Sequence, residues 1–169
     1  MNKDALAARQ APLKAAYRED PAAAIVTMRA SGRLGEGVSC DLETGRAMAS
    51  AGLHPAAGGD GSQLCSGDLL LEALVACAGV TLAAVATSMG LLLRGGSVQA
   101  EGDIDIRGTL AVDKKAPVGF RSIRVSFDLD TDAAEDELAS LARLTERYCV
   151  VWQSLHRPPE GTMSVSRAA

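Results

Sequence analysis

Two cysteines stand in surroundings that could make a thiol reactive. Cys77 lies in the middle of the apolar stretch LLLEALVACAG, and Cys149 follows a tyrosine in the charged stretch TERYCVVW. A thiol reacts as its thiolate, which a nearby positive charge or a helix N-terminus favours. Because Cys77 lies about three turns inside its predicted helix, the N-terminal dipole is too distant to help. We therefore expect a reactive Cys77 to need an arginine brought to it by the fold; otherwise it is a packing residue.

Cys149 is predicted to lie on an amphipathic helix. Helical spacing places it near the apolar stripe that contains Leu138, Leu141 and Ala142, while Glu146 and Arg147 can face water. A thiol at the edge of an apolar face can meet a second thiol from another element. Cys77 and Cys149 are thus a possible peroxidatic and resolving pair, provided that the fold brings their Cα atoms within roughly 7 Å.

The composition indicates one globular domain without a nucleic-acid partner. The chain has 169 residues, of which 47% are hydrophobic and 22% charged, with a net charge of −4 and no basic stripe. The N-terminal stretch has no apolar segment of the secretory type, so we expect a cytoplasmic protein. The cysteines at 40, 65, 77 and 149 form no close pair, which disfavours a disulfide scaffold and a structural metal.

The longest predicted element is a helix that begins at Ser66, its expected N-cap, and ends at Gly95–Gly96. Its length raises the possibility of a membrane span, but Glu72 lies inside it and aromatic anchors are missing. Because the helix is apolar nearly all round, we expect it to be buried on all sides, within the subunit or between subunits. Asp68 suits the first turn.

Strands and a second helix are predicted around this helix. Strands are expected at 22–32 and 37–43, joined by a glycine-containing turn, with 44–61 as a loop or locally helical. Alternation predicts further strands over 97–112 and 119–130, a helix over 133–152 capped by Thr131 or Asp132, and a last strand over 162–167. The result is an α+β domain, residues 22–169, in which antiparallel strands surround a long buried central helix. Residues 1–21 form an N-terminal helical extension.

The run SGDLLLEALVACAG, followed some 70 residues later by ERYCVVWQSL, resembles the OsmC/Ohr family of thiol-dependent hydroperoxide reductases. The resemblance covers roughly residues 22–167, and the two cysteines are its most specific part. It implies an intertwined homodimer with active sites at the subunit interface, a stress-response role and no metal or organic cofactor. It also implies that Cys77 attacks a small organic hydroperoxide, that Cys149 closes a disulfide, and that a dithiol reductant restores the thiols.

The resemblance also implies an arginine and a glutamate beside the first thiol. Arg33 matches the arginine best, with Arg29 as the runner-up; a guanidinium would stabilise the thiolate and orient the peroxide. The family's proline–glutamate pair is here Ser66–Gly67, and its frequent Pro-Val-His run after the second cysteine is here Val150–Val151–Trp152. Glu72 is the nearest substitute, but it lies about 140° from Cys77 around the helix.

Two other functions remain open at this stage. A hydrolase that uses Cys77 would need a histidine base, for which the chain offers only His54 and His156. A dimer that binds a small apolar ligand at its interface would fit the missing glutamate, although both cysteines argue against it. Neither Cys40 nor Cys65 receives a role from the sequence.

Overall fold

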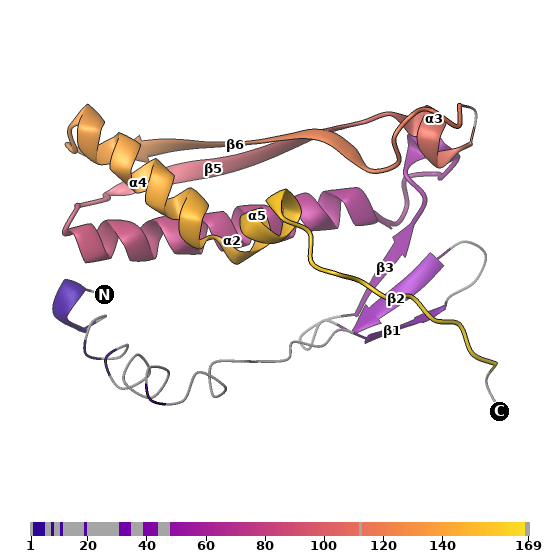
Figure 1. Cartoon of the computed structure of the whole chain (residues 1–169), viewed down its shortest axis with the longest axis horizontal. Helices are drawn as coiled ribbons and strands as arrows, with labels where there is room; N and C mark the ends of the chain where they lie inside the picture. Colours follow the sequence, from indigo (N-terminus) through magenta and orange to yellow (C-terminus); the bar gives the residue numbers. More distant parts are fainter. Residues whose placement is uncertain are drawn as a thin grey trace.

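The computed structural model describes residues 2–5, 8, 11, 19, 31–34, 39–43, 48–111 and 113–167, with the backbone alone at 31–49 within these ranges and at 107. About two thirds of the predicted N-terminal extension therefore lies outside the described residues. Figure 1 shows a long helix, α2, beside a long two-stranded ribbon of β5 and β6, with α4 crossing them. The chain combines antiparallel strands with helices, and the predicted α+β class is confirmed.

The first sheet has four short strands in the order β1-β2-β3-β4. These are β1 (Ser31–Leu34), β2 (Ser39–Glu43), β3 (Met48–Gly52) and β4 (Leu64–Cys65), where β3 and β4 pair in parallel and the other neighbours are antiparallel. β1 occupies residues that the sequence assigned mainly to a turn, and β3 was missed. The short helix η2 (Pro55–Ala57) fits the expected local helicity there.

Helix α2 (Ser66–Met89) begins where it was predicted but ends earlier. Its N-cap is Cys65, one residue before the expected Ser66, and Asp68 lies in the first turn. Gly90 adopts the left-handed conformation (φ 77°), and its N–H bonds the carbonyls of Ala86 and Thr87. Such a cap ends a helix efficiently, because glycine carries no Cβ to clash. Residues 91–94 therefore leave the helix instead of extending it to Gly95.

The second sheet is an antiparallel hairpin of β5 (Gly95–Ile104) and β6 (Phe120–Asp130). The short helix α3 (Ile106–Thr109) lies between the two strands. The alternation predicted for β6 is confirmed: its inner residues are half-buried and the intervening ones are exposed, the inner set being Ile123, Val125, Phe127 and Leu129. The side chain of Arg94 bonds Asp130 (Nε–Oδ1 2.8 Å), which ties the segment after α2 to the end of β6.

The predicted second helix is divided into α4 (Glu135–Tyr148) and α5 (Val150–His156), with Cys149 between them. The N-cap of α4 is Ala134, not Thr131 or Asp132, and its N–H donates to the Glu137 carboxylate (2.9 Å). Residues 158–167 run on from α5 without regular structure, so the predicted last strand is absent within this chain (Figure 1).

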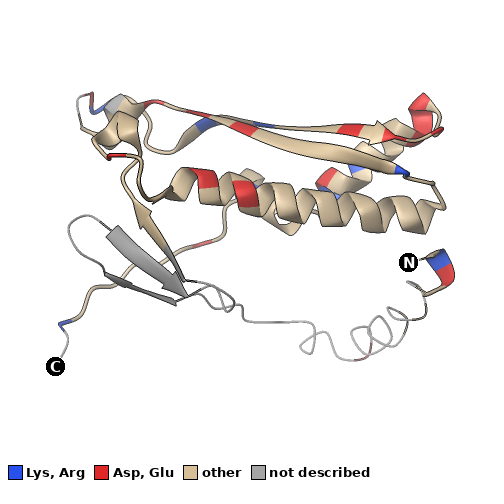
Figure 2. Cartoon of the chain, turned by 180° about the vertical axis from the view of Figure 1, so that it is seen from behind, with Lys and Arg blue, Asp and Glu red and all other residues tan. Residues whose placement is uncertain are grey.

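The core lies where α2, α4 and α5 pack on the hairpin. One cluster contains Leu74, Ala78 and Cys149, and a second contains Leu82, Ala86 and Leu141. Only a narrow stripe of α2 is buried in this chain, every fourth position over part of the helix, the residues being Leu74, Ala78, Leu82 and Ala86. By length and composition alone α2 is apolar enough to cross a membrane. Its charged residues lie near its start, as Figure 2 shows.

Candidate active site

Cys77 lies on α2, directly beside the buried stripe. Its neighbours in the first core cluster are Leu74 and Ala78, which come one turn before it and one residue after it. The thiol itself is half-buried. Because Cys77 faces the edge of this stripe and not its centre, its sulfur can be reached by groups from the helix that covers the stripe.

Cys149 lies at the break between α4 and α5. Its backbone is extended (φ −72°, ψ 110°), its N–H closes α4 on the carbonyl of Thr145 (2.9 Å), and its carbonyl opens α5 by accepting from Gln153 (2.9 Å). The side chain is 1% exposed and packs against Leu74 and Ala78. One residue thus ends one helix, begins the next and carries its thiol onto the stripe beside Cys77.

The two thiols are in contact. Cys77 packs against the core cluster that contains Cys149, each thiol shifts the pKa of the other, and both cysteines are free. They come from helices more than 70 positions apart in the chain, so the contact is made by the fold. The fold therefore brings together the two cysteines that the sequence singled out.

Backbone N–H groups support a thiolate at Cys77. Burial raises the pKa of this thiol, but hydrogen bonds from the N–H of Val151, the thiol of Cys149, the N–H of Val150 and the hydroxyl of Thr81 together lower it below the ordinary thiol value. Val150 and Val151 form the first turn of α5, where N–H groups have no partner inside the helix. The sulfur of Cys77 is therefore a natural acceptor for them.

Cys149 has the opposite electrostatics. Burial raises its pKa, and the neighbouring Cys77 raises it further, although the N–H groups of Trp152 and Val151 work against this rise. The two thiols interact closely, so the first proton lost belongs to the pair. The opposite shifts of the two pKa values favour Cys77 as the thiolate and Cys149 as the protonated thiol.

The arginine and glutamate expected beside Cys77 are not among its described partners. The backbone of Arg33 lies in β1 opposite Asp41, and its side chain is outside the described part, as is the whole of Arg29. Glu72 is exposed and lines a separate groove beside Ala100. Gly67 lies ten residues before Cys77, about 15 Å along the helix at 1.5 Å per residue.

The remaining candidate residues lie apart from the thiol pair. His54 caps η2, where its Nδ1 accepts from the N–H of Ala56 (3.0 Å), and His156 is exposed at the end of α5. Neither histidine is among the described partners of Cys77, which removes support for a cysteine hydrolase. The strand β2 contains Cys40, whose backbone lies opposite Ala51, and Cys65 is half-buried before α2.

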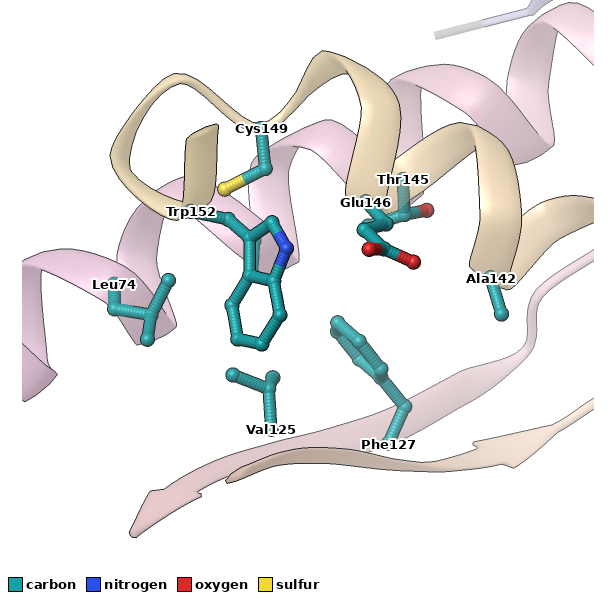
Figure 3. Close-up of a pocket in the computed structure, with 9 residues that line it drawn as sticks. Leu74, Val125, Phe127, Ala142, Thr145, Glu146, Cys149 and Trp152 are labelled. Atoms are coloured by element: carbon teal, nitrogen blue, oxygen red, sulfur yellow. The ribbon is translucent and has the colours of Figure 1, made fainter. Parts of the chain in front are cut away.

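A cavity of about 190 Å³ opens beside the Cys149 thiol (Figure 3). Its walls are mainly apolar and come from α2, β6, α4 and α5, the residues being Leu74, Ala78, Val125, Phe127, Ala142, Thr145, Glu146, Cys149 and Trp152. Glu146 and Ala142 are exposed and mark the mouth, whereas Leu74 and Cys149 are fully buried. A small organic molecule can thus approach the thiol pair from this side.

Three contributors to the site were missed in the sequence. The helix break at Cys149 creates the donor amides, Thr81 adds a hydroxyl, and Trp152 forms a wall of the cavity. Thr81 stood four residues after Cys77, one helical turn away, and spacing alone could have found it. The adjacent valines 150 and 151, which favour helices weakly, were the available sign of the break.

Comparisons with known proteins agree with this fold. The family model described as OsmC-like protein matches residues 59–164. A search of the curated proteins found no match. An OsmC-like protein from Mycoplasma pneumoniae superposes with a TM-score of 0.67 at 14% identity, covering 79% of this chain and 89% of that one.

Two solved structures with a more specific description are also similar. An organic hydroperoxide resistance protein OsmC from Legionella pneumophila has a TM-score of 0.62 at 17% identity over 79% of this chain and 92% of its own. An organic hydroperoxide resistance protein from Elizabethkingia anophelis has a TM-score of 0.64 at 13% identity, over 79% and 91%. At these identities the likeness concerns the fold. The family match covers well over half of the sequence, and the chain belongs to the OsmC-like family.

Proposed function

We infer that the protein reduces small organic hydroperoxides through a cycle of its two cysteines, Cys77 and Cys149. The observation that carries this proposal is the packing of Cys77 against the buried Cys149, in surroundings that lower the pKa of Cys77 and raise that of Cys149. A peroxidase of this kind needs a thiolate to attack and a second thiol within reach to resolve.

The first step breaks the O–O bond of the hydroperoxide. The Cys77 thiolate attacks one peroxide oxygen and becomes a sulfenic acid, while the other oxygen takes a proton and leaves as an alcohol. Cys149 then attacks the sulfenic sulfur and water leaves, which gives a Cys77–Cys149 disulfide. A dithiol donor reduces this disulfide by thiol exchange and is itself oxidised.

Arg33 is proposed as the guanidinium that orients the peroxide. Its place in β1, in the small sheet that leads into α2 through β4, is compatible with an approach to a thiolate on that helix. Two oxygen acceptors suit the fork of an arginine better than the point charge of a lysine. Arg29 remains the second choice for this role.

The active unit is proposed to be an intertwined homodimer in the cytoplasm. Most of the apolar surface of α2 is unburied in one chain, including Val80, which is 73% exposed. The four-stranded and two-stranded sheets are separate, and Met163 and Val165 stand 97% and 96% exposed on the C-terminal segment. A second copy would cover the exposed apolar face of α2. Its strands could also pair with the free edges of the two sheets and with the C-terminal segment.

The proposal is tested by disulfide mapping. The fully reduced protein receives one equivalent of cumene hydroperoxide, and mass spectrometry identifies the cysteine peptides that become joined. We expect a Cys77–Cys149 bond, its loss in Cys77→Ser and in Cys149→Ser, and its retention in Cys65→Ser, the matched control. Thiols that stay reduced in the folded protein, or a bond through Cys65 instead, would exclude the cycle.

A further inference from the structure

The indole of Trp152 carries an unused hydrogen-bond donor in the interior. Among the side chains of the described residues, its Nε1 is the buried polar atom for which no hydrogen-bond partner is present. Burying such an N–H without a partner costs free energy, and buried indoles usually find an acceptor. Trp152 is also the only tryptophan in the sequence, so any signal from an indole in this protein reports on this position.

The unused donor lies on a side chain that lines the cavity beside Cys149. Trp152 forms one wall, and Figure 3 shows its indole between Leu74, Val125 and the ring of Phe127. Among the described lining residues, the Thr145 hydroxyl bonds the Leu141 carbonyl (2.7 Å), and the Cys149 thiol lies beside Cys77. The N–H itself is not open to the cavity, so a small rotation of the indole would present it, as an unused donor, to a molecule held by mainly apolar walls.

Size and charge limit what the cavity can hold. Its volume is about 190 Å³, and an apolar cavity of about 150 Å³ is sufficient for benzene. One ring with a short substituent therefore fits. The carboxylate of Glu146 stands at the mouth, and the described lining residues include no lysine or arginine. An anionic ligand would thus meet a like charge without a compensating cation, which favours an uncharged molecule.

We propose that this cavity is a binding site for a compact, uncharged and mainly apolar molecule with one oxygen acceptor, which Trp152 recognises by donating its indole N–H. The proposal goes beyond peroxide reduction. It requires no reaction at Cys77, and the cavity borders Cys149 instead. Small pockets of this kind commonly combine apolar walls with one placed polar group that sets specificity.

Two nearly isosteric probes separate the hydrogen bond from simple burial. Acetophenone has a carbonyl oxygen where 2-phenylpropene has a CH₂ group, and both are one-ring molecules. In ¹H–¹⁵N spectra of the ¹⁵N-labelled, reduced protein, acetophenone is expected to move the single indole N–H resonance downfield and saturably, whereas 2-phenylpropene leaves it without a downfield shift. Equal shifts with both probes, or no saturable change with acetophenone, would overturn the proposal.

The variant Trp152→Phe keeps an aromatic ring and removes the N–H. By calorimetry, we compare the dissociation constants of acetophenone and 2-phenylpropene. The preference for acetophenone should be about tenfold smaller in Trp152→Phe than in the wild type, because one buried hydrogen bond is lost. Val125→Ala, the control, alters the wall without touching the donor and should weaken both probes alike. An unchanged ratio in folded Trp152→Phe contradicts the proposal.

The charge requirement and the link to catalysis are checked separately. Benzoate has a similar size and carries acceptor oxygens, but its charge should keep it out; saturable binding of benzoate to the wild type would refute an uncharged ligand. All these readouts are made on unreacted thiols. They therefore stand or fall independently of the disulfide mapping that tests peroxide reduction.

Discussion

Replacing Val150 with proline tests whether backbone N–H groups activate Cys77. Val150 is the first residue of α5, its N–H helps to lower the pKa of Cys77, and its side chain is 67% exposed. Proline suits the first position of a helix, where the N–H has no helical partner. The residue before a proline must be extended, and Cys149 already is (φ −72°, ψ 110°). Val150→Pro thus removes one donor with little other change.

The size of the effect follows from the strength of one hydrogen bond to a charged group. Such a bond contributes about 1.5–3 kcal/mol, and we take the lower end because Val151 and Cys149 contribute more strongly than Val150. About 1.4 kcal/mol changes the thiolate population tenfold. A thiolate with a higher pKa is also a better nucleophile. With a Brønsted coefficient of about 0.45, this gain restores about threefold of the lost rate. The net rate near neutral pH should fall about threefold.

The assay follows thiol exchange at one cysteine. In a background with Cys40→Ser, Cys65→Ser and Cys149→Ser, an aromatic disulfide reacts with Cys77 alone, and the released thiolate is measured from pH 5 to 11. Serine at 149 still offers a hydroxyl donor. We expect Val150→Pro to be slower than its parent at neutral pH and faster at the alkaline plateau, so that the two profiles cross.

The crossing distinguishes a lost hydrogen bond from damage to the fold, which would shift the rate in one direction at all pH values. The control Val150→Ala removes the same side chain, keeps the N–H and should follow the parent. If the proline and alanine variants behave alike, or if the proline profile is unmoved along the pH axis, backbone donation does not activate Cys77.

Four further predictions concern stability and charge. Leu74→Ala removes a side chain with 0% exposure and should lower the free energy of unfolding by about 3–5 kcal/mol in urea; a loss below about 1 kcal/mol would contradict its place in the core. Gly67→Ala should raise that free energy by about 0.5–1 kcal/mol, because the new Cβ meets only ordinary contacts, the nearest at 3.5 Å. Gly90→Ala should lower the free energy of unfolding by about 1–2 kcal/mol, because Gly90 is left-handed (φ 77°). A loss of stability in Gly67→Ala, or a gain in Gly90→Ala, would contradict the corresponding assignment. The hydrogen bonds from Arg124 hold the pKa of Asp103 at about 2, so its contribution to stability is present above the ordinary carboxyl pKa and is lost as the pH falls toward 2. NMR titration should show this midpoint, and Arg124→Gln should move it upward; an unmoved midpoint would argue against the pairing.

The elements with strong periodicity were predictable from the sequence. The alternation over 119–130 placed β6 and its inner face, and the apolar run after Ser66 placed α2, because side-chain burial alone dictates those patterns. The ends of elements were less predictable. Gly90 ends α2 through a backbone conformation that many glycines can adopt, and the pattern of apolar residues continues past it without a break.

The chemistry of the candidate site was predictable only in part. Cys77 and Cys149 were identifiable by type and context, but their contact depends on the packing of α5 against α2. An arginine was expected to support the thiolate, whereas the described donors include backbone N–H groups of Val150 and Val151. Backbone donors leave no trace in residue types, since every residue except proline carries one. The position of the helix break decides where they point.

The break at Cys149 also couples the oxidation state of the thiols to the backbone. In the reduced chain, the N–H groups of Val150 and Val151 are held by the Cys77 sulfur. A disulfide would replace this polarisable anion with a neutral, weakly accepting sulfur, and the first turn of α5 would lose part of its anchorage. Amide hydrogen exchange at these two valines would then accelerate on oxidation. The exchange rate of this one turn of backbone would thereby report whether the two thiols are reduced or joined in a disulfide.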